Sequence, residues 1–274
     1  MPVHDVRNSD TAASAEKEVL MFNVLPLSSS KISPKTMKKA LVILAAATIG
    51  TSSLIAQDET GVRFGMKLSP NLGFVNPDTR GYTSSGTNAG YTFGLMAEFP
   101  IGTSGNYQFA TGMNLNNVSG AWKETYTYAE DVTGPTRTRD LETNVKLRYI
   151  ELPLTIKMMT NEIGYMRYFG QVGFGNALNI RAKSDIIVPT IAGTRTDGTA
   201  IVTEFTELEN EDIQDDINIY KASLIVAAGM EYNFSGNTSL LVAVTYNNGF
   251  TDILKSKDVK AMANYLELTV GIFF

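Results

Sequence analysis

The residues of this sequence that could do acid–base chemistry are charged side chains placed within short apolar segments. They share one face of these segments: Arg63, Lys67, Glu98, Glu151, Lys157, Arg167, Glu231 and Glu267. Two carboxylates in one site can act as general acid and general base, which makes Glu98, Glu151 and Glu231 candidates. Four acids and four bases can also neutralise one another as an ion-pair network. We predict such a network, and no catalytic residue.

Histidine and cysteine chemistry is excluded from most of the chain. His4 is the only histidine, and there is no cysteine. His4 precedes a segment that we expect to be removed, so we expect no Ser–His, Cys–His or histidine–metal site in the mature protein. We therefore predict a protein that is not an enzyme and that binds no cofactor and no metal. The net charge of −5 also gives no basic footprint for nucleic acid.

Two further motifs are better explained without a ligand. One is an acidic stretch that contains Glu204, Glu207, Glu209, Glu211, Asp212, Asp215 and Asp216. Its spacing does not fit a calcium-binding loop, and we expect a solvated acidic loop. The other is the glycine run Gly170, Gly173 and Gly175, which has neither the spacing nor the following helix of a phosphate-binding loop.

The first 56 residues predict export. Residues 37–56 read MKKALVILAAATIGTSSLIA, with two lysines, an apolar stretch and small residues before the end. This order is that of a Sec-type signal peptide, and the apolar stretch is too short to span a bilayer. Residues 1–36 are polar and patternless, and we interpret them as a disordered upstream extension from a start codon assigned too early. The alternative is a signal peptide with a long leading region.

After residue 57 the sequence alternates between apolar and polar residues, which is typical of strands with two unlike faces. Eight such segments occur, at 62–68, 91–99, 107–116, 147–158, 165–174, 222–234, 239–247 and 265–274. One face is large and apolar, and the other carries small, polar and charged residues. Tight turns join the second segment to the third, the fourth to the fifth and the sixth to the seventh, whereas the other connections are long.

This pattern predicts an all-β domain over residues 57–274. We expect a transmembrane antiparallel up-and-down β-barrel of eight strands, with short periplasmic turns and long extracellular loops. An Arg or Lys facing lipid at the midplane would cost about 2–4 kcal/mol, so we place the charged face inside the barrel. Aromatic residues near the short turns should form an interfacial girdle: Phe99, Tyr107, Tyr165, Tyr232, Phe234 and Phe274.

Two features of the long connections carry separate predictions. Residues 186–205 contain a hairpin signal at Asp197–Gly198, which we interpret as the fifth and sixth segments rising beyond the membrane. A ten-stranded barrel is the alternative. Trp122 begins the second long loop, and we expect it in an outer girdle or on an exposed contact surface.

The chain ends on an apolar row, Leu268, Val270, Ile272 and Phe274. In lipid every backbone polar group needs a partner, so we expect this last strand to pair with the first. The aromatic end also resembles the C-terminal signal that the outer-membrane assembly machinery reads. We therefore expect that machinery as a partner.

Several segments resemble a known family. They are GVRFGMKLSPNLGF (61–74), YIELPLTIK (149–157), GQVGFG (170–175) and YNNGFTDI (246–253). They are similar to the small outer-membrane β-barrel family of Bacteroidota, also called PorT-like or porin family, over about residues 57–274. The resemblance implies the shape of eight-stranded barrels such as OmpX and the OmpA membrane domain. For some members it implies a role in protein secretion and gliding.

We therefore expect a non-enzymatic integral protein of a Gram-negative outer membrane, embedded in its lipid. It would act through its extracellular loops in interaction, adhesion or envelope structure, with a protein partner at the loops. The alternatives are an accessory component of a PorT-like secretion system, a narrow porin, and a soluble lipocalin-like barrel that binds a ligand. A lipocalin-like barrel would require the apolar face inside and the charged face outside.

Overall fold

A computed structural model describes residues 61–235, 238–256 and 259–274. The predicted upstream extension (1–36) and signal peptide (37–56) lie outside the described residues. No helix in the described ranges is long and apolar enough to cross a bilayer.

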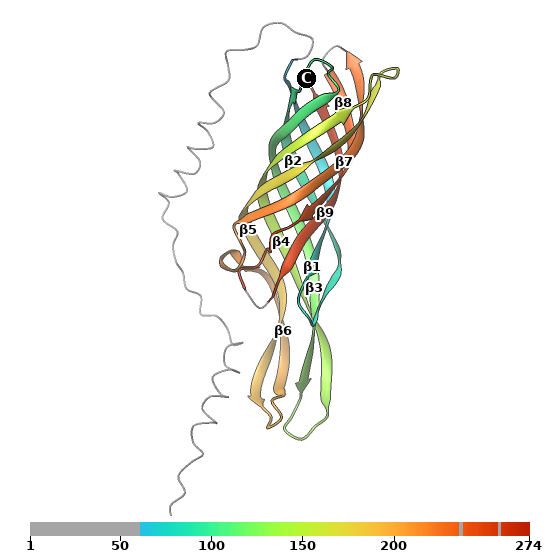
Figure 1. Cartoon of the computed structure of the whole chain (residues 1–274). Helices are drawn as coiled ribbons and strands as arrows, with labels where there is room; N and C mark the ends of the chain where they lie inside the picture. Colours follow the sequence, from blue (N-terminus) through green and yellow to red (C-terminus); the bar gives the residue numbers. More distant parts are fainter. Residues whose placement is uncertain (1–60, 236–237, 257–258) are drawn as a thin grey trace, which may run out of the picture. The chain divides into compact units, whose positions relative to one another are not determined.

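Eight long strands form a closed antiparallel ring (Figure 1). They are β1 (Arg63–Pro77), β2 (Tyr82–Pro100), β3 (Tyr107–Ala129), β4 (Thr136–Met159), β5 (Met166–Thr194), β7 (Tyr220–Ser235), β8 (Thr238–Gly249) and β9 (Ala261–Phe273). Each strand pairs with the next one around the ring, and β9 pairs with β1 from Gly65–Phe273 to Pro77–Ala261. The predicted closure of the barrel by the last strand is therefore confirmed.

The two faces of the strands point as the alternation predicts. On β9, Leu268 is 50% exposed whereas its neighbour Glu267 is 2% exposed. The aromatic residues near the short turns, including Tyr107, Tyr165 and Phe274, are also exposed on the outer wall. Apolar side chains thus face outward and polar ones inward, because a barrel in lipid must cover its outer wall with hydrocarbon-like groups.

Two hairpins prolong the barrel on the extracellular side (Figure 1). The first arm is formed by 119–129 of β3 and 136–145 of β4, and the second by 185–194 of β5 and strand β6 (Ala200–Asp212). The hairpin predicted at Asp197–Gly198 is present, but its returning strand is β6, which is separate from β7. A 3-10 turn, η2 (Gln214–Asp216), lies between them. β6 lies outside the ring, which therefore has eight strands and not ten.

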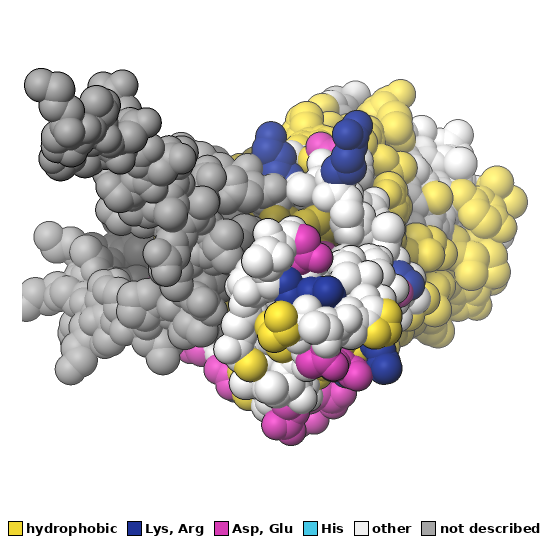
Figure 2. Space-filling model, turned by 90° about the horizontal axis from the view of Figure 1, so that it is seen from below, with side chains coloured by type: hydrophobic (Ala, Val, Ile, Leu, Met, Phe, Trp, Pro, Cys, Tyr) yellow, Lys and Arg dark blue, Asp and Glu magenta, His cyan; other side chains and the backbone are white. Residues whose placement is uncertain are grey.

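The two arms contact each other near their tips. Tyr128 and Ala129 pair in parallel with Ala200 and Ile201 of β6. The ring of Phe205 packs edge-on against Tyr128, with 5.0 Å between the ring centroids. Seen from this end, the arms present a polar and charged surface, and apolar side chains gather on the barrel wall (Figure 2).

Candidate functional site

The lumen near the short turns contains a buried ion cluster from four strands. Lys157 of β4 is 0% exposed, and its Nζ lies 2.6 Å from Oε1 of Glu98 and also pairs with Glu231. Arg63 of β1 pairs with the same two carboxylates, at 2.9 Å from Oε2 of Glu231. Two cations and two carboxylates therefore neutralise one another, with Lys157, Glu98 and Glu231 buried and the Arg63 side chain 23% exposed.

Aromatic rings support this cluster. Lys157 Nζ lies 4.1 Å from the centre of the Phe169 ring, and the Arg63 guanidinium lies 4.6 Å from that of Phe273. Phe169 and Phe273 belong to an apolar group with Met159, Leu241 and Ala243. The periplasmic end of the lumen is therefore filled by charged pairs and the rings on which they pack.

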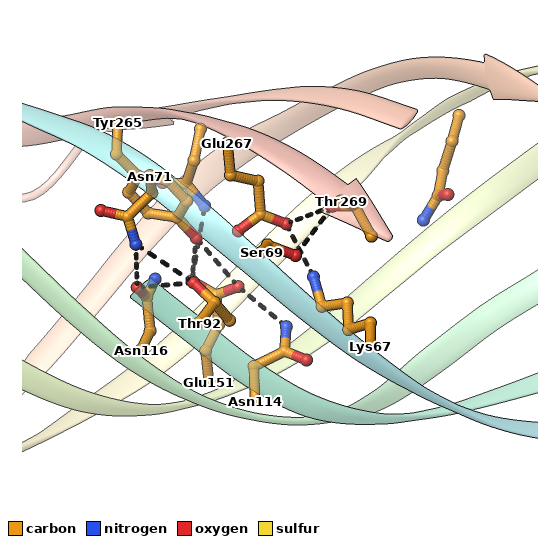
Figure 3. A network of polar contacts seen from close by, with 12 residues as sticks. Lys67, Ser69, Asn71, Thr92, Asn114, Asn116, Glu151, Tyr265, Glu267 and Thr269 are labelled. Atoms are coloured by element: carbon orange, nitrogen blue, oxygen red, sulfur yellow. Dashed lines mark hydrogen bonds and ion pairs between the residues drawn. The ribbon is translucent and has the colours of Figure 1, made fainter. Parts of the chain in front are cut away.

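A second polar layer lies in the middle of the barrel (Figure 3). Lys67 Nζ lies 2.7 Å from Oε1 of Glu267, and the hydroxyl of Thr269 donates to the same oxygen at 3.1 Å. Ser69 in turn donates to Thr269 at 3.0 Å. All four of these groups come from β1 and β9, so the seam that closes the ring is joined by side chains as well as by backbone.

Glu151 is the centre of a third layer. It accepts hydrogen bonds from the hydroxyl of Tyr265 at 3.0 Å and from Asn114 at 3.4 Å (Figure 3). It also accepts one from Asn247 at 3.4 Å. Lys221 donates to Asn247 at 3.2 Å, so a cation lies next to this carboxylate. Lys221 is absent from the predicted network because it lies one residue before the predicted strand at 222–234. Lys221 lies two residues before the inward-facing Ser223, so the two side chains share one face of the strand, and this spacing is the signal that could have identified it.

The structure brings seven of the eight predicted network residues into these three lumen layers. The exception is Arg167, which is 43% exposed on its side chain and pairs with Glu162 at 3.8 Å. Arg167 is the second residue of β5 and lies beside the short turn. It is therefore at the lumen mouth, where a flexible arginine turns toward water instead of joining the cluster.

The middle of the lumen contains a small cavity that is lined by both polar and apolar side chains. Its volume is about 70 Å³, and its lining includes Lys67, Glu151, Tyr265 and Glu267. This volume holds a few water molecules and no larger solute. One oxygen of Glu267, Oε2, has no hydrogen-bond partner in the described part of the chain, so a water in the cavity would satisfy it.

An apolar core closes the lumen at its extracellular end. Ile217 and Ile253, from the loops after η2 and β8, are fully buried against Val75, Leu147 and Trp122. The two loops are joined by a hydrogen bond from the amide of Asn218 to the carbonyl of Ile253 at 2.8 Å. The expectation that Trp122 lies in an outer girdle or exposed surface is wrong, because its side chain points inward and is 8% exposed.

The arms carry exposed charge but no recognisable metal site. The acidic residues at 204, 207, 209 and 211 are exposed. Within the described residues, no three His, Cys, Asp or Glu side chains converge to hold a metal ion. At the first arm's turn, hydrogen bonds from the amides of Thr133 and Gly134 lower the pKa of Asp131 below its usual value.

Comparison with known proteins gives similarities to other outer-membrane barrels. Neisserial surface protein A is 16% identical over 78% of this chain and 99% of its own, with a TM-score of 0.37. Ail of Yersinia pestis is 12% identical over 78% and 97%, with a TM-score of 0.33. OprG of Pseudomonas aeruginosa is 10% identical over 78% and 96%, with a TM-score of 0.38. Such similarities carry no information on activity.

Comparison by sequence identifies the family. No curated protein matches the sequence at a significant level. The family model described as "Outer membrane protein beta-barrel domain" matches residues 55–255, which include eight of the nine strands. This match agrees with the closed ring, its apolar outer wall and its polar interior. The chain belongs to the outer membrane protein beta-barrel domain family, and its place is the outer membrane of a Gram-negative bacterium.

Proposed function

We propose that this protein is a non-enzymatic barrel that acts through its extracellular arms, by binding a partner at the cell surface. The observation that carries this proposal is the contrast between the two ends of the molecule. The lumen is filled by the ion cluster, the polar layers and the apolar core around Trp122. The joined arms extend beyond the barrel and expose charged and apolar side chains.

The filled lumen argues against the narrow-porin alternative. A solute would have to displace Ile217 and Ile253 at one end and separate Lys157 from Glu98 at the other. Separating a buried ion pair costs several kcal/mol. The outward apolar face argues equally against a soluble lipocalin-like barrel, which would need the reverse orientation.

We also propose that the protein has no catalytic activity. The buried carboxylates Glu98 and Glu231 are each shared between Lys157 and Arg63. A general acid needs a proton to give and a substrate within hydrogen-bond reach. A cavity of about 70 Å³ leaves no room for a substrate beside them.

A role as accessory component of a PorT-like secretion system is the second candidate, and it rests on the sequence resemblance alone. The two candidates place the partner at opposite ends of the barrel. The exposed arm residues Val132 and Leu208 mark the extracellular end, and Ile101 and Ile163 in the short turns mark the periplasmic end.

Site-specific photo-crosslinking in intact cells tests the proposal. A photoreactive amino acid would replace Val132 or Leu208 in one set of strains and Ile101 or Ile163 in the other. We expect discrete crosslinked products from the arm positions only. Products from the turn positions alone would contradict the arm-mediated role and favour the secretion component.

A further inference from the structure

The outer wall carries a basic groove that none of the lumen layers uses. Four cations line it, Lys146 and Arg148 from β4 with Arg181 and Lys183 from β5, and its volume is about 320 Å³. Small residues on the neighbouring strands also line it, Ala89, Gly90 and Ser119. The groove is therefore a hollow in the wall and not only a charged surface.

The pairing of the strands concentrates like charges in this groove. Arg148 lies directly opposite Arg181, and Lys146 lies directly opposite Lys183. Side chains in such positions have Cβ atoms about 4.5–5.5 Å apart, and like charges there destabilise a sheet. Two stacked pairs of this kind favour the binding of an anion, and the protein supplies one carboxylate, Asp185, at the lysine end.

A β-bulge creates the arrangement. The register of β4 and β5 shifts between Arg148 and Tyr149, which leaves Ile180 as the extra residue. Before the bulge Leu178 and Ile180 face outward, and after it Ala182 and Ser184 are buried inside. The bulge therefore turns Arg181 and Lys183 to the outer wall, and bulges of this kind re-aim side chains at functional positions.

The protein satisfies the lysines but leaves the arginines available. Lys183 donates to the carbonyl of Asn210 at 3.1 Å, and Lys146 pairs with Asp185 at 2.6 Å. Asn210 has a positive φ of 56°, an uncommon conformation for a residue other than glycine. Two further acids lie near the lysines and are exposed: Asp212 lies opposite Lys183 in the register, and Glu211 lies opposite Ser184.

The arginines differ from these lysines. Arg148 uses its Nε to donate to Asn117 at 2.6 Å, which fixes the guanidinium and leaves its two terminal nitrogens free of protein acceptors in the described ranges. The guanidinium of Arg181 meets no protein acceptor among the described residues. Two guanidinium groups in this state match the forked geometry with which arginine binds a phosphate.

The height of the groove on the barrel identifies the source of the anion. From Met158 to Ile150 the outward residues of β4 are apolar, and Arg148 is the first cation above them. Ten residues of strand rise about 33 Å, which at a tilt of about 40° gives about 25 Å, the height of the apolar band of such barrels. Arg148 and Arg181 therefore lie at the headgroup level of the outer leaflet.

We propose that the groove binds the phosphate group of a phosphorylated glycolipid of the outer leaflet, of the lipid A type. Arg148 and Arg181 hold the phosphate between them, with Lys146 and Lys183 contributing charge. Tyr91, at the membrane side of the groove, lies where the sugar meets the acyl chains. This inference rests on the barrel's place in the outer membrane and is independent of the role proposed for the arms.

Binding of lipid A to the purified barrel in detergent micelles tests the proposal. Four probes are titrated: phosphorylated lipid A, the same lipid with its phosphates removed, phosphatidylglycerol, and sodium phosphate. We expect phosphorylated lipid A to bind at least tenfold more tightly than each of the others. Equal binding of the dephosphorylated lipid, or of phosphatidylglycerol, would overturn the assignment. Equal binding of sodium phosphate would indicate a free-anion site and would also overturn it.

Variants connect the binding to the groove. We expect Arg148→Gln with Arg181→Gln to weaken lipid A binding at least tenfold. The matched control, Arg80→Gln with Arg137→Gln, removes two exposed arginines elsewhere and should change it less than twofold. Equal affinities of the two double variants would refute the proposal.

A measurement without lipid separates binding from folding. If the arginines had a structural role, their replacement would lower the unfolding temperature in lipid-free detergent. We expect the temperature of Arg181→Gln to stay the same or rise, because this side chain has no protein acceptor and its replacement removes the like-charge pair, whereas Arg148→Gln also loses the hydrogen bond to Asn117. Arg181→Gln alone removes a side chain without a protein acceptor, and it should still weaken lipid A binding at least threefold. A lowered unfolding temperature with unchanged lipid binding would contradict the proposal.

Discussion

Lys157 and Glu98 form an ion pair of 2.6 Å across the interior of the barrel, with the lysine fully buried. Glu231 shares the same lysine, and Arg63 completes the cluster. The three buried charges, Lys157, Glu98 and Glu231, are therefore dependent on one another and on Arg63, because water cannot solvate them in place. The cluster acts as a single structural unit that fills the periplasmic end of the lumen.

Replacing Lys157 should destabilise the barrel strongly. Lys157→Met leaves Glu98 and Glu231 with only Arg63, and we expect a loss of about 3–5 kcal/mol in the free energy of unfolding. Urea titration in detergent, followed by heat-shifted gel mobility, measures the loss. Lys123→Met is the matched control, since Lys123 pairs with Asp140 on the exposed first arm. Similar midpoints for both variants would contradict a buried cluster.

The hydroxyl of Tyr265 should have a measurable effect on stability. Tyr265→Phe removes the donor that lies 3.0 Å from Glu151 and leaves that buried carboxylate with only the two long hydrogen bonds from Asn114 and Asn247. We expect a loss of about 1–3 kcal/mol. The control is Tyr246→Phe, whose ring is exposed on the outer wall. If the two variants unfold at the same urea concentration, the hydrogen bond does not contribute.

Trp122 provides a direct probe of the extracellular core because it is the only tryptophan. Its burial predicts a blue-shifted emission that acrylamide and iodide quench poorly. Ile217→Asp and Ile253→Asp place a charge in the apolar core beside it, and both should shift the emission to the red. The exposed Ile163→Asp should leave the spectrum unchanged. Strong iodide quenching in the unaltered protein would mean that the mouth is open.

The turn of the first arm should loosen at acidic pH. Asp131 accepts hydrogen bonds from the amides of Thr133 and Gly134, which lower its pKa in the folded state. The stabilisation is therefore present above the unfolded carboxyl pKa of about 3.9 and is lost as the pH falls through the lower, folded value. Hydrogen exchange should show constant protection of both amides down to about pH 4. Equal protection in Asp131→Asn at pH 7 would contradict this origin.

The sequence was sufficient to predict the ring and the direction of its faces. Period-two alternation, as at Glu267 and Leu268, separates the residues of one face from those of the other. A barrel in lipid has its apolar face outside and its polar face inside, the reverse of a soluble protein, so the direction of each face follows. The lengths of the arms were not predicted, since a strand that leaves the membrane has no apolar face to mark it. β3 therefore extends to Ala129, beyond the predicted end at residue 116.

Tertiary contacts explain the remaining errors. Trp122 is buried because Ile217 and Ile253, about a hundred residues away, fold over it, and no local pattern records such a contact. The basic groove depends on a single bulge at Ile180. Beyond the bulge, the odd-numbered residues of β5, such as Arg181, face outward, whereas before it the even-numbered residues do. Period-two counting along one strand cannot locate such a bulge, because the bulge is defined by the register with the partner strand.

Ion conductance across a planar lipid bilayer tests the central claim, a sealed lumen, most directly. The reconstituted protein is compared with a variant that carries five substitutions. Ile217→Gly and Ile253→Gly remove the extracellular core. Lys157→Ala, Glu98→Ala and Glu231→Ala remove most of the periplasmic cluster. The measurement uses 1 M KCl, where the screening length is about 3 Å and even weak pores conduct measurably. The unaltered protein should give no discrete current steps, and the variant should give such steps. Stable steps from the unaltered protein would contradict the sealed lumen and restore the narrow porin.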